Sequence, residues 1–225
     1  MYKVMTSLRF MVLWLVGGVV TLALATVVAA FSLLGLSLTT GIAYMVGGYS
    51  LRYILLMLAL IFMSLFGLAV GLITGSLQKS TMQQKYDAQF RWWRTLSAFG
   101  GALGMLLTGI ALNVPLQRML LTWAIPPKQV ILLYGALPIM LPFVVMALLQ
   151  WFVLQRYVHG AWTWILAHAV GGLVMYSLLV TVVLSGGLIL PIFLIALVAP
   201  WIVSGFTMVW LFQFNTRSAW PDDFN

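Results

Sequence analysis

Few side chains of this sequence could do chemistry, and those few lie too far apart for the common catalytic sites. The chain of 225 residues has no cysteine and no glutamate, and its only acids are Asp87, Asp222 and Asp223. It contains no His-Glu-x-x-His, no paired carboxylates inside an apolar run and no Gly-x-Ser-x-Gly. These absences predict that the protein is not an enzyme and that its own side chains form no metal site.

His168, in the run WTWILAHAVGG (162–172), is the one ionisable side chain expected within a membrane span. A neutral imidazole at that depth can hydrogen-bond to a neighbouring helix. It could also be the axial ligand of a chlorin magnesium or a haem iron, with Ala169, Gly171 and Gly172 leaving room for the macrocycle. The sequence leaves both interpretations open.

The elements that must position His168 are long apolar runs. The chain is 64% hydrophobic and 6% charged, with a mean hydropathy of +1.11, whereas soluble domains have about 25% charged residues. A membrane-spanning helix needs about 20 largely apolar residues. Six stretches qualify: residues 11–37, 53–77, 95–112, 131–154, 161–184 and 189–213. The runs are continuously apolar, so we expect an all-α integral membrane protein with six transmembrane helices in a single domain (1–225).

The basic residues predict how these helices are threaded through the membrane, because Lys and Arg collect in cytoplasmic connections. With the N-terminus inside, the outer connections hold only Arg52, Arg118 and Lys128, and the other eight bases lie inside. We therefore expect both chain ends in the cytoplasm and residues 78–94 as the main basic cytoplasmic loop.

The basic residues that give the net charge of +8 are expected to contact lipid headgroups rather than nucleic acid. The bases lie between apolar runs instead of on one soluble face, so anionic headgroups are the expected counter-charge. Tryptophan also favours the headgroup level. The expected headgroup anchors are Arg91, Trp92, Trp93, Arg94, Trp151, Arg156, Trp162 and Trp164.

Two outer connections are longer than simple turns. Asn113 could cap a short helix over 114–124 that lies on the outer surface, with Pro115 in its first turn. The uncharged, glycine-rich segment 39–48 is either a loop or a shallow dip into the interface, and both remain open.

Two stretches of the chain repeat one pattern. Gln78 and Gln150 each end an apolar run, and Trp93 and Trp164 follow them by 15 and 14 residues. Paired glycines come next, at 100–101 and 171–172. This spacing predicts a parallel repeat of two helical hairpins (helices 2–3 and 4–5), with SGFTMVWLFQ (204–213) as half of a third copy.

Small residues let membrane helices approach closely. We therefore expect helix packing at Gly67, Gly71, Gly75, Gly100, Gly104, Gly171 and Gly172. The alternative is that these glycines clear space for a flat cofactor. The glutamines are expected to cap carbonyls or to bond across helices.

Gly71, Gly75 and Gln78, together with LLQWFVLQRYVHGAWTWILAHAVGG (148–172), carry a resemblance to a known group. The pattern resembles uncharacterised multipass membrane proteins of cyanobacteria and filamentous green phototrophs. It covers helices 2–5, although SLQKSTMQQK (76–85) lacks the Trp-x-Val-Leu that follows Gln150. The resemblance implies a bacterial protein, and therefore the plasma (inner) membrane as its location, but it implies no activity.

The expected role is that of a non-catalytic accessory subunit of a larger membrane complex, such as a photosynthetic or electron-transfer assembly. Such a subunit would pack against other membrane proteins and bind lipid, quinone or pigment. The alternative is a small uncoupled transporter or channel. A transport path needs convergent polar groups, and the serines and threonines of the spans, Ser64, Thr74, Ser97 and Ser204 among them, are not expected to gather at one depth.

Overall fold

The computed structural model describes residues 7–21, 23, 49–86, 90–122, 136–185 and 190–215. Within these ranges the chain is built of helices and contains no strand, so the predicted all-α fold is confirmed. The N-terminal helix covers Ser7–Thr21. The others are α2 (Tyr49–Tyr86), α3 (Trp93–Thr122), α5 (Ala136–Leu154), α6 (Thr163–Leu184) and α7 (Leu190–Phe214).

Three segments of the described helices are long and apolar enough to cross a membrane. They are Met57–Tyr86, Thr163–Val182 and Leu194–Phe214. Ser7–Thr21 and Met140–Leu154 are apolar but shorter. The described chain is therefore that of a membrane protein. Most of the predicted 11–37 span beyond Thr21, the 39–48 segment and the start of the predicted 131–154 span lie outside the described residues.

Helix α2 is longer than the sequence predicts. It has 38 residues and ends at Tyr86 instead of residue 77, and α3 begins at Trp93. The predicted loop 78–94 is therefore corrected to a short connection. The polar run after Gln78 contains no glycine or proline and is rich in Gln, Lys and Met, which favour helices. At 1.5 Å per residue α2 is about 57 Å long, so its polar end extends beyond a hydrocarbon core of about 30 Å.

Helix α3 also runs past its predicted end. It continues from Trp93 to Thr122, through the Asn113 position where a separate surface helix over 114–124 was expected to begin. Residues 123 and 124 lie outside the described chain. A proline removes only one helical hydrogen bond and is tolerated in membrane helices, so a helix that has already formed need not stop and restart at this point.

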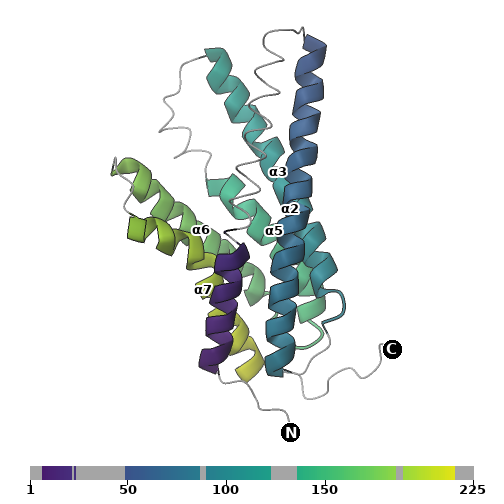
Figure 1. Ribbon diagram of the computed structural model, residues 1–225, viewed down its shortest axis with the longest axis vertical. Helices are drawn as coiled ribbons and strands as arrows, with labels where there is room; N and C mark the ends of the chain where they lie inside the picture. The colour runs from purple at the N-terminus through teal and green to yellow at the C-terminus, as the bar shows by residue number, and fades with distance from the viewer. Residues whose placement is uncertain are drawn as a thin grey trace.

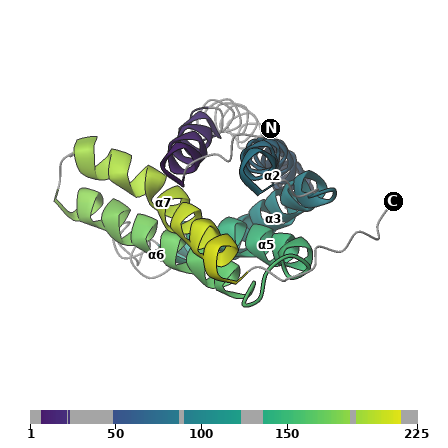
Figure 2. The same ribbon diagram turned by 90° about the horizontal axis from the view of Figure 1, so that it is seen from below.

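The helices form a bundle whose two described chain ends lie at the same end (Figure 1). The α2–α3 and α5–α6 connections lie there too, and α2–α3 and α6–α7 lean apart toward the opposite end. We call the first end the aromatic end. Seen from below, the N-terminal helix lies between α7 and α2, and α3, α5 and α6 complete the circuit (Figure 2). Each of α2, α3, α5, α6 and α7 packs against the next of them along the chain.

Glycines set the close approach of α2 and α3. A Cβ atom at Gly67 would collide with the backbone of Gly101, and one at Gly101 would collide with that of Gly67. A Cβ at Gly71 would collide with the Ser97 carbonyl, and one at Gly75 would lie 2.6 Å from the Ser97 Oγ. The backbones of α2 and α3 are therefore in direct contact along this antiparallel pair. Membrane helices associate through such close packing, because lipid tails leave little hydrophobic driving force between them.

Three further glycines face the next helix along the chain. An added Cβ at Gly100 would lie 2.5 Å from the Met146 Cα, and one at Gly104 would lie 2.6 Å from the Pro142 Cα, both in α5. Gly171 of α6 approaches α7 in the same way, with 2.7 Å from its added Cβ to the Pro200 Cα. Helix α3 therefore presents Gly101 to α2 and Gly100 with Gly104 to α5.

Candidate functional site

A buried polar network joins α2, α3, α5 and α6 near the aromatic end. The Gln150 Nε2 donates to the Gln78 Oε1 at 2.9 Å and to the Ser97 Oγ at 2.8 Å. The indole of Trp93 donates to the Gln78 Oε1 at 3.1 Å, and that of Trp164 donates to the Gln150 Oε1 at 2.9 Å. We call these five residues the polar layer. All are at most 2% exposed.

The polar layer depends on the glycine contacts described above. Ser97 reaches Gln150 because Gly100 brings α3 against Met146 of α5 close to this level. Gly71 and Gly75 bring α2 against α3 beside Ser97. The Ser97 hydroxyl in turn donates to the Trp93 carbonyl at 2.7 Å. An unpaired polar group in such a dry interior is costly, so glycine packing and polar pairing support each other. The glutamines bond across helices, which was one of the two roles expected from the sequence.

His168 lies next to the polar layer. Its side chain is 3% exposed, its Nδ1 is 3.0 Å from the Trp164 carbonyl oxygen, and the two rings meet edge to face at 4.3 Å. This Nδ1 contact would also suit an axial ligand, because metal-bound histidines commonly donate their other ring nitrogen to a carbonyl. However, Gly171 and Gly172, which were expected to leave room for a macrocycle, rest against Pro200 and Met140.

A surface hollow does exist, but on another part of the molecule. It lies between α2, α3 and α5, and its lining includes Ser64, Phe99 and Leu103 but not His168. Among the described residues, no group of three His, Cys, Asp or Glu side chains could hold a metal ion. The contacts around His168 thus favour a packing role, and axial ligation stays a prediction.

We expect the substitution His168→Leu to leave the visible absorption spectrum of the purified protein unchanged, because neighbouring side chains already fill the space beside the ring. The measurement compares wild type and variant after extraction from the native membrane in a mild detergent. A band in the wild type that the variant loses would show ligation by His168 instead.

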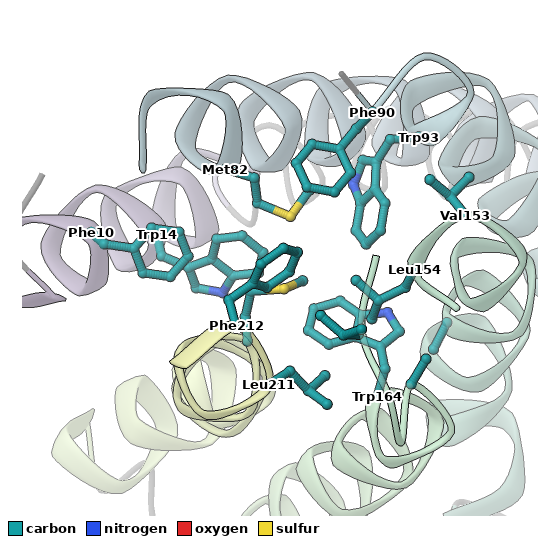
Figure 3. Packing of buried hydrophobic residues seen from close by; sticks show 14 of the residues in the cluster. Phe10, Trp14, Met82, Phe90, Trp93, Val153, Leu154, Trp164, Leu211 and Phe212 are labelled. Atoms are coloured by element: carbon teal, nitrogen blue, oxygen red, sulfur yellow. The ribbon is translucent and has the colours of Figure 1, made fainter. Parts of the chain in front are cut away.

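Trp93 and Trp164 of the polar layer also belong to a buried aromatic cluster (Figure 3). The ring centroids of Trp93 and Trp164 are 5.9 Å apart, and those of Trp14 and Trp164 are 6.1 Å apart. Phe90 and Phe212 close the cluster toward the chain ends, with their ring centroids 6.0 Å apart. Such ring pairs add about 0.5–1.5 kcal/mol each beyond area burial. The cluster therefore packs the helices of the described bundle against one another at the aromatic end.

The N-terminal helix is tied to this cluster by three further hydrogen bonds. The Trp14 indole donates to the Ser204 Oγ of α7 at 3.2 Å. The Lys85 ammonium of α2 donates to the Ser7 Oγ at 2.9 Å, and the Gln213 amide of α7 donates to the same oxygen at 3.0 Å. Lys85 also lies over the Phe10 ring, 5.0 Å from its centroid. The start of the N-terminal helix is thereby fixed to the ends of α2 and α7.

Two tryptophans expected to be headgroup anchors are core residues instead. Trp93 and Trp164 are both 0% exposed, because their indole N–H groups donate to glutamines inside the bundle rather than to water or headgroups. Their neighbours Trp92 and Trp162 are 52% and 57% exposed. The two helix starts thus place one indole inward and the other outward.

The basic residues among the expected anchors lie on the surface. Arg91, Arg94 and Arg156 are exposed, while Trp151 is partly buried. The Arg91 guanidinium lies over the Trp92 ring, 5.7 Å from its centroid. Charge and exposed indole therefore occur together at the aromatic end, where a headgroup could contact both.

Sequence reasoning missed Trp14, Ser204 and Lys85 as partners in this site. Trp14 and Ser204 are 190 positions apart, so no local spacing relates them. The one usable signal was the interpretation of residues 204–213 as half of a third hairpin. In addition, Ser97 and Ser204 lie beside buried Trp93 and Trp14, respectively, whereas Ser64 and Thr108 bond to carbonyls of their own helices.

Compared with known proteins, the chain matches no family model, no curated protein and no solved structure.

Proposed function

We propose that the protein is a non-catalytic polytopic subunit of a larger complex in a bacterial inner membrane. The observation that carries this proposal is the polar layer, whose buried side chains hydrogen-bond to one another. Side chains paired in this way hold helices together and are not available to a substrate. A role in scaffolding needs stable packing and no reactive group, which is what this interior supports.

The proposed threading has six spans with both chain ends in the cytoplasm, and the aromatic end is then the cytoplasmic end. This assignment is supported by exposed Arg91, Arg94 and Arg156, which belong to the two connections at that end. Positive residues favour the cytoplasmic side, and anionic lipids there attract them. Exposed Trp92 and Trp162 fit the headgroup level.

The proposed partners are other membrane subunits that cover apolar outer faces of the bundle. Large apolar side chains are exposed along α2, α6 and α7, including Phe62, Leu65, Leu166, Leu173 and Phe206. These faces suit lipid tails and the apolar helices of a neighbouring subunit alike. Lipid, quinone or pigment held between the subunits, as in a photosynthetic or electron-transfer assembly, belongs to this proposal.

A second candidate, a small uncoupled transporter or channel, gains support from the gathering of polar groups in the polar layer. A transport path needs polar side chains that converge. On this alternative the pairs of the polar layer would have to separate during transport. It remains second because each of those bonds is made inside a closed, dry cluster.

We expect the protein, extracted from its native membrane in a mild detergent, to migrate as part of a larger particle with other membrane proteins in fixed ratio. The reason is that the buried polar side chains of the polar layer are paired with one another and hold helices together. The measurement is affinity purification, native electrophoresis and mass spectrometry of the co-purifying proteins. A lone particle that conducts ions or solutes after reconstitution into vesicles would overturn the subunit role and favour the transporter.

A further inference from the structure

The N-terminal helix lies beside α7 in the same way as α3 lies beside α2 and α6 beside α5. In each pair, an indole of one helix donates to a polar side chain of the other. The pairs are Trp93 with Gln78 at 3.1 Å, Trp164 with Gln150 at 2.9 Å, and Trp14 with Ser204 at 3.2 Å. All three donor helices run away from the aromatic end (Figure 1).

The positions that follow each tryptophan also correspond. Four residues after Trp93, the Ser97 hydroxyl donates to the Trp93 carbonyl, and four residues after Trp164, the His168 Nδ1 lies 3.0 Å from the Trp164 carbonyl. Four residues after Trp14 comes Gly18, which has no side chain. There a Cβ atom would lie 2.5 Å from the Trp201 ring, so an indole of α7 occupies the space.

Each of the three helices also contacts the next helix around the bundle. Gly100 of α3 contacts Met146, four positions before Gln150, and Gly171 of α6 contacts Pro200, four positions before Ser204. The N-terminal helix contacts α2 at a different register, since Gly17 lies three residues after Trp14 and faces Leu77, the neighbour of Gln78. Its place between α7 and α2 closes the circuit (Figure 2).

We infer that the chain consists of three helical hairpins closed into a ring, and that the third hairpin is made of its two ends, α7 and the N-terminal helix. Trp14, Trp93 and Trp164 then occupy equivalent places and together seal the aromatic end of the ring. The face between α2 and α7 is filled by the chain itself, so a partner subunit has to bind elsewhere. This inference does not depend on the proposed role as a subunit.

Cysteine cross-linking in the full-length protein tests the position of the N-terminal helix, and the natural absence of cysteine makes the experiment clean. A Cβ at Gly17 would lie 3.5 Å from the Leu77 Cβ and meet nothing closer, which lies within the range of a disulfide. The double variant Gly17→Cys/Leu77→Cys should form an intramolecular disulfide in membranes on mild oxidation. The matched control, Gly17→Cys/Ser76→Cys, uses the exposed neighbour of Leu77 and should stay reduced.

The cross-link is read as protection of both thiols from a maleimide of high mass, on a denaturing gel. Thiols that stay as reactive in the Gly17/Leu77 variant as in the control would overturn the inference. So would a disulfide found only in dimers, because the helix would then belong to a second copy.

Equivalence of the three indoles is tested separately by the substitutions Trp14→Phe, Trp93→Phe and Trp164→Phe. Each should lower the thermal unfolding midpoint in detergent by a similar amount, about 3 °C or more, because each removes one buried hydrogen bond. Trp210→Phe, at a half-exposed site, is the control. A Trp14→Phe variant as stable as this control would show that the N-terminal helix is an appendage and not part of a third hairpin.

Discussion

Replacing Gly71 by leucine should prevent the α2–α3 hairpin from packing and remove most of the folded protein from the membrane. Even one methyl group at Gly71 would collide with the Ser97 carbonyl, and its Cβ would lie 2.9 Å from the Ala98 Cα. Because these obstacles are backbone atoms, no change of rotamer relieves them. We expect the substitution to lower the free energy of unfolding by more than about 3 kcal/mol, which is at the upper end of the usual cost of overpacking.

The control for this experiment is Leu72→Ala on the next residue of the same helix. The Leu72 side chain is exposed, so its truncation should leave the yield nearly unchanged. Both variants are compared by expression level and by size-exclusion chromatography of the fluorescently tagged protein in detergent. Equal yields for Gly71→Leu and Leu72→Ala would contradict the close backbone contact between α2 and α3.

The substitution Gln150→Leu should have the next largest effect, because it removes three hydrogen bonds from the polar layer at once. The Trp164 indole would lose its acceptor, and Gln78 and Ser97 would lose a donor. Leucine has nearly the same volume as glutamine, so little of the effect comes from packing. At about 0.6–2 kcal/mol per bond between membrane helices, we expect the free energy of unfolding to fall by about 2–6 kcal/mol.

Gln84→Leu provides the matched control, since Gln84 is an exposed glutamine of α2. Thermal unfolding in detergent measures both variants. The combination of Gln150→Leu with Trp164→Phe should cost less than the sum of the two single changes, because both disrupt the same hydrogen bond. Strict additivity would mean that Trp164 and Gln150 do not interact as the structure places them.

The positions of several helices could be predicted from the sequence, because each apolar run has the length of a span. The expected spans 161–184 and 189–213 nearly coincide with α6 and α7. The ends of α2 and α3 could not be predicted in this way. Hydropathy marks where a chain leaves lipid, whereas a helix ends only where its backbone bonding stops, and the polar residues up to Tyr86 keep that bonding intact.

The candidate site could be predicted only in part. The shared spacing from glutamine to tryptophan pointed to Gln78, Trp93, Gln150 and Trp164 without showing that they meet. Composition alone could not separate buried Trp93 from exposed Trp92, because both stand at the start of one helix and differ only in the direction of the side chain. That direction is set by the helices packed around them, so it depends on contacts distant in sequence.

The bond between Trp14 and Ser204 has a consequence for how the protein is made. The N-terminal helix cannot make this bond until Ser204 has been synthesised, because 190 positions separate the two residues. At about 5–20 residues per second, that delay is roughly 10–40 s. During that interval the Trp14 N–H lacks its final acceptor within an apolar medium. The bond that ties the N-terminal helix to α7 therefore belongs to the last stage of folding, after Ser204 has been synthesised.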